Sequence, residues 1–220
     1  MPADFDHNKI IAHTARSVLK PHGLFQKGSS RIWIDDNGWY LTVVEFQPSG
    51  WGKGTYLNVG IHFLLREQDY LSFDFGGRMK EFVSAEDPER FSSDMEELAV
   101  IALDKVMEYR KFRDVSYAQK QMRKDSAGMR AHRLYNQMMV CGLMEDRRAL
   151  RYHSDLWEQV RFSAVAHEIA YRQELAERID PIVADKAAFK VYILSKIQKQ
   201  RNFWHSKSSM KKVSSVYSFL

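Results

Sequence analysis

Two short motifs in the sequence carry the residue types that catalysis would use. Gly52-Lys53-Gly54-Thr55 is similar to the end of a phosphate-binding loop, and His167-Glu168 is similar to part of a zinc-protease motif. Both are incomplete, because Gly54 replaces the Ser or Thr that such a loop requires, and no second histidine lies four residues from His167. The glycines are better explained by a turn between two strands, since Gly adopts the positive φ angles that turns require.

His62 and Cys141 are two further side chains of reactive type. His62 falls in the middle of a predicted strand near Asn58, where a hydrogen-bonded structural histidine is far more common than a general base. A hydrolase centred on His62 and Asn58 is an alternative that no further motif supports. Cys141 lies in an apolar helical stripe and is typical of a small core residue. Because the eight histidines are scattered and there is one cysteine, the sequence predicts no catalytic residues, no metal site and no cofactor.

The stretch Trp39–Leu65 must position His62 and Asn58, and it is predicted to form two long strands joined by a Gly-rich loop. Residues 55–65 alternate between two faces, as in a half-buried strand. Upstream, Asn37-Gly38 predicts a two-residue hairpin turn, because both central residues of that turn need positive φ. This turn would pair Ile34 with Leu41 and Ile32 with Val43, which gives the sheet one aliphatic face.

The second face of this sheet is predicted to be aromatic and partly polar. Exposed aromatic patches often mark sites where another protein binds. The competing explanation is that another part of the chain covers the face, and solvent exposure distinguishes the two. The predicted partner-binding residues are Trp33, Tyr40, Phe46, Tyr56, Asn58 and His62.

The hydrophobic pattern predicts an α+β fold, with an antiparallel β-sheet and an N-terminal helix followed by a helical C-terminal half. Two short strands are expected at Tyr70–Phe75 and Glu81–Ser84, and Ser93 with Glu96 has the pattern of a capping box at a helix start. The predicted domains are an α+β sheet domain at 1–112, a helical region with hairpin-like helices at 113–204, and a basic Ser-rich tail at 205–220.

The composition indicates a folded protein of a reducing compartment. Hydrophobic residues make up 45% of the chain and aromatic residues 13%, enough for a substantial core. One cysteine excludes an intramolecular disulfide framework. No secretory signal and no run of about 18 apolar residues is visible. We therefore expect a soluble, cytoplasmic protein that does not associate with membranes.

The positive net charge of +5 is concentrated at the C-terminus. Residues 190–220 contain seven Lys or Arg and no acidic residue. Cations interleaved with aromatic side chains are typical of nucleic-acid contacts, because the cations bind phosphates and the rings stack on bases. An acidic protein partner would use the same residues. The predicted nucleic-acid contacts are Lys190, Lys196, Lys199, Arg201, Trp204, Lys207, Lys211 and Lys212.

Three segments resemble an uncharacterised family of bacterial cytoplasmic α+β proteins that is known only as a domain of unknown function. They are residues 20–27 (KPHGLFQK), 45–49 (EFQPS) and 56–61 (YLNVGI), and the resemblance covers about residues 6–112. Such families lie among bacterial conflict genes, so the resemblance implies an accessory role in immunity or phage defence.

These observations together predict a non-enzymatic module that binds another protein. The alternative is a nucleic-acid-binding accessory protein that uses the basic C-terminal helix and tail.

Overall fold

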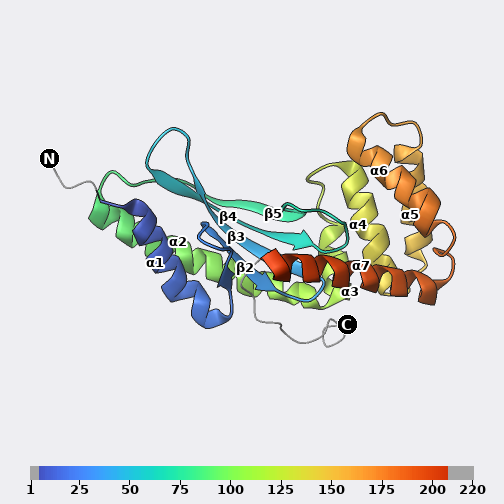
Figure 1. Cartoon of the computed structure of the whole chain (residues 1–220), viewed down its shortest axis with the longest axis horizontal. Coiled ribbons are helices and arrows are strands. Elements are labelled where there is room, and N and C mark those ends of the chain that lie inside the picture. The colour runs from blue at the N-terminus through green and yellow to red at the C-terminus, as the bar shows by residue number, and fades with distance from the viewer. Residues whose placement is uncertain (1–4, 208–220) are drawn as a thin grey trace. The chain divides into compact units, whose positions relative to one another are not determined.

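The fold is α+β, as the sequence predicted. The computed structural model describes residues 5–207, without the side chain of Lys207. A five-stranded antiparallel sheet has the strand order β1-β2-β3-β4-β5 (Figure 1). Its strands are β1 (Phe25–Gln26), β2 (Ile32–Asp36), β3 (Tyr40–Pro48), β4 (Gly54–Phe63) and β5 (Phe75–Ser84).

Helices precede and follow the sheet. The α-helices are α1 (His7–Leu19), α2 (Pro88–Tyr109), α3 (Val115–Met122), α4 (Arg130–Leu143), α5 (Arg148–Val160), α6 (Ala166–Glu174) and α7 (Lys186–Lys207). Short turns are η1 (Lys20–His22), η2 (Arg110–Arg113) and the π-helical η3 (Leu175–Ile179). None of the helices within residues 5–207 has the length and apolar character needed to cross a membrane.

The described residues form two compact units. The sheet unit comprises residues 5–62, 70–110 and 203–207, and the helical unit comprises residues 63–69 and 111–202. The long helix α7 contributes its last turn to the sheet unit and the rest of its length to the helical unit.

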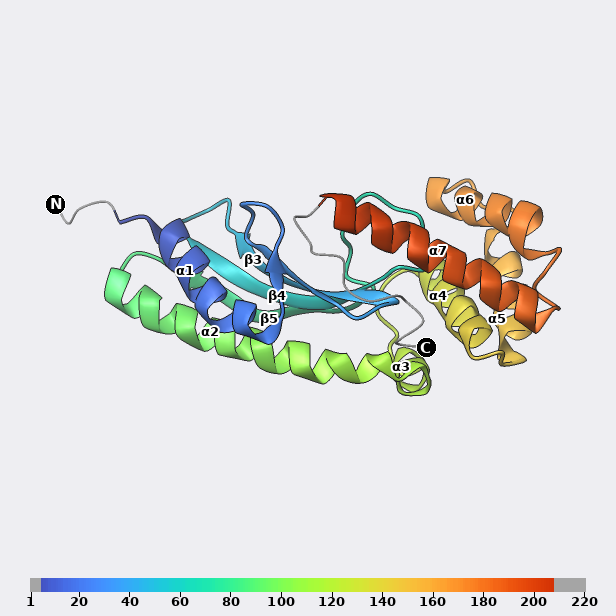
Figure 2. The same cartoon turned by 60° about the horizontal axis from the view of Figure 1, so that its bottom comes forward.

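The N-terminal helix that the sequence predicts is α1. The Asp6 side chain accepts a hydrogen bond from the Asn8 backbone N–H at 3.0 Å, which caps the first turn. Ile11, Ala15 and Leu19 form the buried stripe of the helix. In the sheet unit α1 and α2 lie against each other on one face of the sheet (Figure 2).

The hairpin between β2 and β3 differs from the predicted two-residue turn. Its strands pair Ile34 with Val43 and Asp36 with Leu41, so the register is displaced by two residues from the predicted one. Gly38 has a φ of 87°, but Asn37 does not have positive φ. The Asn37 side chain is buried and donates to Asp35 and Thr42, and its backbone N–H donates to the Tyr40 carbonyl, so the turn residues are Gly38 and Trp39 instead. A displacement of two residues leaves every side chain on its predicted face.

Two further boundaries differ from the sequence predictions. The strand β5 is one strand of ten residues that includes Gly76-Gly77, whereas two short strands around these glycines were predicted. The helix α2 begins at Pro88 and not at Ser93, because Asp87 caps it by accepting hydrogen bonds from the Glu89 and Arg90 backbone N–H groups.

The helical unit is built around α4. The apolar stripe predicted around Cys141 lies on α4, where Ala131, Tyr135, Met138 and Cys141 are buried and Leu134 is half-buried. A Cβ atom at Gly142 would lie 2.5 Å from the side chains of Phe189 and Ile193 on α7. Gly142 therefore permits the close approach of α4 and α7.

Candidate functional site

A hydrogen bond between side chains on neighbouring strands shows which residues share a face of the sheet. The Asn58 Nδ2 on β4 donates to the Glu45 Oε2 on β3 at 2.9 Å, so these two side chains lie on the same face. Because side chains alternate along a strand, Phe46 lies on the opposite face from Asn58. The prediction that Trp33, Tyr40 and Phe46 share a face with Tyr56, Asn58 and His62 is therefore wrong. Sequence alternation gave each strand's two faces correctly but could not say how β3 and β4 are matched.

Trp33, Tyr40 and Phe46 belong to the core of the sheet unit. Their relative exposures are 2%, 0% and 0%, so they offer no surface to a partner. The Tyr40 hydroxyl donates to the Tyr109 backbone carbonyl at 2.7 Å, on the face that α2 covers. This face also carries Asp35, whose carboxylate accepts two hydrogen bonds of 2.9 Å from Arg110. That pairing raises the pKa of the Arg110 guanidinium.

The other face is closed at one end by the last turn of α7. His62 is buried, and its ring lies edge-on to the Trp204 ring with 5.7 Å between centroids. The His62 Nδ1 accepts a hydrogen bond from the Ser72 backbone N–H at 3.2 Å. His205, next to Trp204, contacts the Asp36 carboxylate at 2.9 Å. His62 therefore anchors structure, and it lies roughly 13 Å along the strand from Asn58, too far for a shared catalytic site.

The opposite end of the same face is open to solvent. We define the rim patch as Trp51, Tyr56, Arg78 and Phe82. Trp51 lies in the β3–β4 loop and is 99% exposed, and Phe82 on β5 is also exposed. The Tyr56 and Phe82 ring centroids are 5.3 Å apart, and the Arg78 guanidinium carbon lies 4.1 Å from the Tyr56 centroid. The rim patch combines three aromatic side chains with one arginine.

Polar side chains behind the rim patch hold Arg78 in place. The Arg78 Nη2 donates to the Gln47 Oε1 at 3.0 Å, and the Asn58 Nδ2 donates to the same oxygen at 2.8 Å. Asn58 in turn is fixed by Glu45. Of the six residues predicted to bind a partner, Tyr56 is part of the rim patch and Asn58 supports it from below. The sequence analysis missed Trp51, Arg78 and Phe82. A tryptophan that directly follows Pro-Ser-Gly in a loop belongs to no strand or helix that would bury it, and this signal could have identified Trp51.

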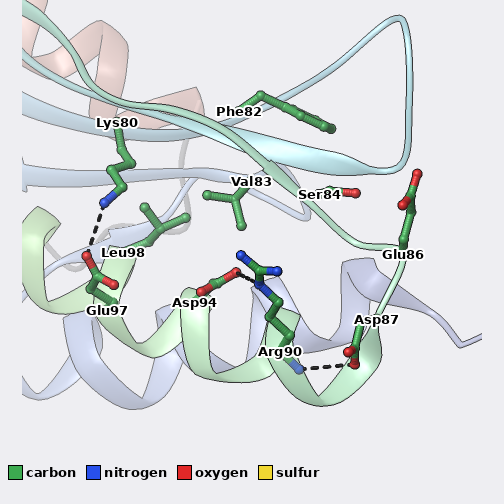
Figure 3. Close-up of a pocket in the computed structure, with 10 residues that line it drawn as sticks. All are labelled: Lys80, Phe82, Val83, Ser84, Glu86, Asp87, Arg90, Asp94, Glu97 and Leu98. Carbon is green, nitrogen blue, oxygen red and sulfur yellow. Dashed lines mark hydrogen bonds and ion pairs between the residues drawn. The ribbon is translucent and has the colours of Figure 1, made fainter.

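A groove adjoins the rim patch on the other side of β5. The β5–α2 groove has a volume of about 460 Å³ and is lined by β5, the connection to α2 and the first half of α2. Figure 3 shows Lys80 and Val83 directed from β5 toward α2, with Phe82 on the opposite side of the strand. The Lys80 Nζ lies 3.2 Å from the Glu97 carboxylate across the groove. The strand β5 thus lies between the rim patch and a charged groove, and Phe82 borders both.

The predicted nucleic-acid contacts on α7 do not form an open basic surface. Lys190 pairs with Glu145 at 2.9 Å, and Lys199 pairs with Glu67 at 2.6 Å. Lys196 pairs with Glu174, and Arg201 and Trp204 are 3% and 2% exposed. Residues 190–207 contain no carboxylate, and Lys190, Lys196 and Lys199 are each neutralised by a carboxylate from an earlier part of the chain. The side chain of Lys207 and residues Lys211 and Lys212 lie outside the described part of the chain.

Lys196 belongs to a buried polar network in the helical unit. Its Nζ donates to the Tyr135 hydroxyl at 3.0 Å, and the Tyr135 and Tyr192 hydroxyls donate to the Glu174 Oε1 at 2.8 and 2.7 Å. Burial lowers the pKa of Lys196, although Glu174 opposes this shift. Burial raises the pKa values of Tyr135 and Tyr192. The polar groups satisfy one another, so the network stabilises the helical packing.

His132 lies beside this network. The Tyr171 hydroxyl is 3.1 Å from the His132 Nδ1, and the Tyr171 ring stacks on the Tyr135 ring with centroids 4.6 Å apart. Burial lowers the pKa of His132 to about 4, and the positive charge of Arg66 adds to the effect. His132 is therefore neutral in the folded protein near neutral pH.

Cys141 is buried, as predicted, and burial raises the pKa of its thiol to about 11. Within residues 5–207, no group of three or more His, Cys, Asp or Glu side chains has the arrangement of a metal site. Comparison of the chain with protein-family models, with curated proteins and with solved structures found no match.

Proposed function

We propose that the protein is a binding module that recognises another protein through the rim patch. The observation that carries this proposal is the complete exposure of Trp51, whose chain neighbour Gly52 lies close to the Phe82 ring of the Tyr56–Phe82 pair. A tryptophan exposed on a loop gains nothing for folding, whereas Trp, Tyr and Arg are the residues most enriched at binding hot spots. An accessory role in immunity or phage defence is part of the same proposal.

The surroundings of Arg78 add support. Its side chain is held by Gln47, by Asn58 and by the Tyr56 ring before any partner arrives. Fewer rotamers are then lost on binding, which improves affinity because the entropic cost of association is smaller. The rim patch is thus prepared to bind a protein surface with aromatic and arginine anchors.

The test is photo-crosslinking in the cell that produces the protein. A photo-reactive amino acid at position 51 should form one dominant crosslinked species, whose protein component mass spectrometry identifies. The same amino acid at Lys124, an exposed residue of the helical unit, is the matched control. Trp51→Ala should weaken binding of the purified partner by about 2 kcal/mol, or roughly 30-fold. Equal crosslinking at positions 51 and 124, or crosslinking to nucleic acid in place of protein, would overturn the proposal.

A further inference from the structure

The strand β5 is the longer of the two edge strands of the described sheet, and its side away from β4 is called the open edge here. Among the described strands it is hydrogen-bonded to β4 alone, and it extends for ten residues. The Ala85 backbone N–H, just beyond the strand, donates to the Lys53 carbonyl at 2.9 Å on the β4 side. Because successive residues direct their backbone groups to alternate sides, those of Ser84 point toward the open edge, and a β-bulge between Val83 and Lys80 interrupts this alternation further along the strand. An edge of this kind can accept a further strand.

The β5–α2 groove lies along this part of β5. Its volume of about 460 Å³ falls within the range of roughly 300–1,000 Å³ that is typical of ligand pockets. Val83 and Leu98 provide apolar lining, and Asp94 lies beside them (Figure 3). An added strand would place every second side chain over this groove, because side chains alternate along a strand. The side chains between them would lie on the rim-patch side of β5.

The charge of the groove favours a basic side chain. Its lining contains four carboxylates but two cations, Lys80 and Arg90. Lys80 is paired with Glu97, and Arg90 is 3.9 Å from Asp94. The excess negative charge would attract a Lys or Arg, whose aliphatic stem can pack on Val83 and Leu98. The four carboxylates are those of Glu86, Asp87, Asp94 and Glu97.

We propose that an extended segment of a partner protein adds to β5 as a sixth strand, with a Lys or Arg side chain in the β5–α2 groove and apolar side chains against the rim patch. This inference rests on the proposed protein-binding function and specifies its mode. A second copy of the chain is a poorer occupant, because it would bring the same excess of carboxylates to the same edge. The charges of Arg78, Lys80 and Glu81 on β5 also guard the edge against indiscriminate pairing.

The test titrates the full-length protein with synthetic ten-residue peptides in which Lys alternates with Val or Tyr. The Lys peptide should bind at least tenfold tighter than the same peptide with Glu in place of Lys. In an added strand every second N–H group of the peptide faces β5, and the others face away. Methylation of the peptide nitrogens that face β5 should abolish binding, whereas methylation of the alternate set should leave binding unchanged. Hydrogen exchange should become slower at the backbone amide of Ser84.

Protein variants locate the peptide on the molecule. Glu86→Gln with Asp94→Asn should weaken the Lys peptide at least tenfold, whereas Asp104→Asn, on the same helix outside the groove, should have no effect. Absence of binding, equal affinity of both methylation patterns or equal affinity of the Lys and Glu peptides would each overturn strand addition. Because methylation changes the peptide alone, a misfolded variant cannot obscure the result. These failures would leave crosslinking at position 51 unaffected, so they are distinguishable from failure of the proposed function.

Discussion

Lys196 in the helical unit is 4% exposed and surrounded by Glu174 and Tyr135, whereas Arg78 at the edge of the sheet is exposed above Tyr56. Both cations contact a carboxylate or an amide and an aromatic ring. In the helical unit these contacts are buried and the polar groups satisfy one another, so the contacts add stability. At the rim patch one side of each contact faces solvent, so the same chemistry remains available to a partner. The difference shows that exposure, and not residue type, separates a stabilising cluster from a binding surface.

Removal of the buried cation should have the largest effect on stability. We expect Lys196→Met to lower the free energy of unfolding by about 3–5 kcal/mol, because Glu174 would remain buried without its cation. Replacement of both residues, by Lys196→Met with Glu174→Leu, should recover much of the loss. Urea unfolding followed by circular dichroism measures both variants. If Lys196→Met costs no more than Lys199→Met, the buried network is not a source of stability.

Two tryptophans at opposite ends of one sheet face provide a direct comparison. Trp204→Ala should destabilise the protein by about 3–5 kcal/mol, because it leaves a cavity over His62. Trp51→Ala should change stability by no more than about 0.5 kcal/mol, because the side chain is fully exposed. Thermal unfolding of the two variants tests the pair, and a large loss for Trp51→Ala would mean that Trp51 supports the fold.

Acid should destabilise the helical unit through His132. The pKa of His132 is about 4 in the folded protein, against an ordinary value of 6.5. As the pH falls through this interval, the unfolded chain takes up the proton first, so stability is full above pH 6.5 and is lost toward pH 4. The slope should reach at most about 1.4 kcal/mol per pH unit. His132→Gln should flatten the slope in urea titrations between these pH values, and Arg78→Gln, at the rim patch, should leave it unchanged.

The fold was largely predictable because it depends on local patterns. The alternation in residues 55–65 identifies a strand, although β4 is buried on both faces and not on one as predicted, and the stripe on α4 identifies a helix. The candidate site was less predictable because it depends on pairing between distant residues. The match of Glu45 to Asn58 places Tyr56 away from Trp33, and no local pattern encodes that match.

Charge was misleading for the same reason. Residues 190–220 carry no acidic residue, yet Lys190 and Lys199 find carboxylates 45 and 132 residues earlier in the chain. Sequence reasoning counted the cations correctly, but the partners that neutralise them are visible only in the folded structure. Trp51 was not predicted as a binding residue, because the glycines on its C-terminal side already explained the loop as a turn between two strands.

The smallest effect is expected where the sequence analysis predicted nucleic-acid binding. Lys199 is 67% exposed at its side chain and paired with Glu67. Exposed pairs typically contribute about 0.2–1 kcal/mol, so Lys199→Ala should change stability by no more than that. Because Lys190 and Lys199 are already neutralised, neither releases many counterions from a phosphate backbone. The salt dependence of oligonucleotide binding should therefore be the same for the wild type and for the variant with Lys190→Ala and Lys199→Ala. A flatter slope for that variant would show that nucleic acid displaces the carboxylates of Glu145 and Glu67. The matched variant carries Lys211→Ala and Lys212→Ala. If the slope is flatter for this variant only, any nucleic-acid contact belongs to these two lysines and not to the paired lysines of α7.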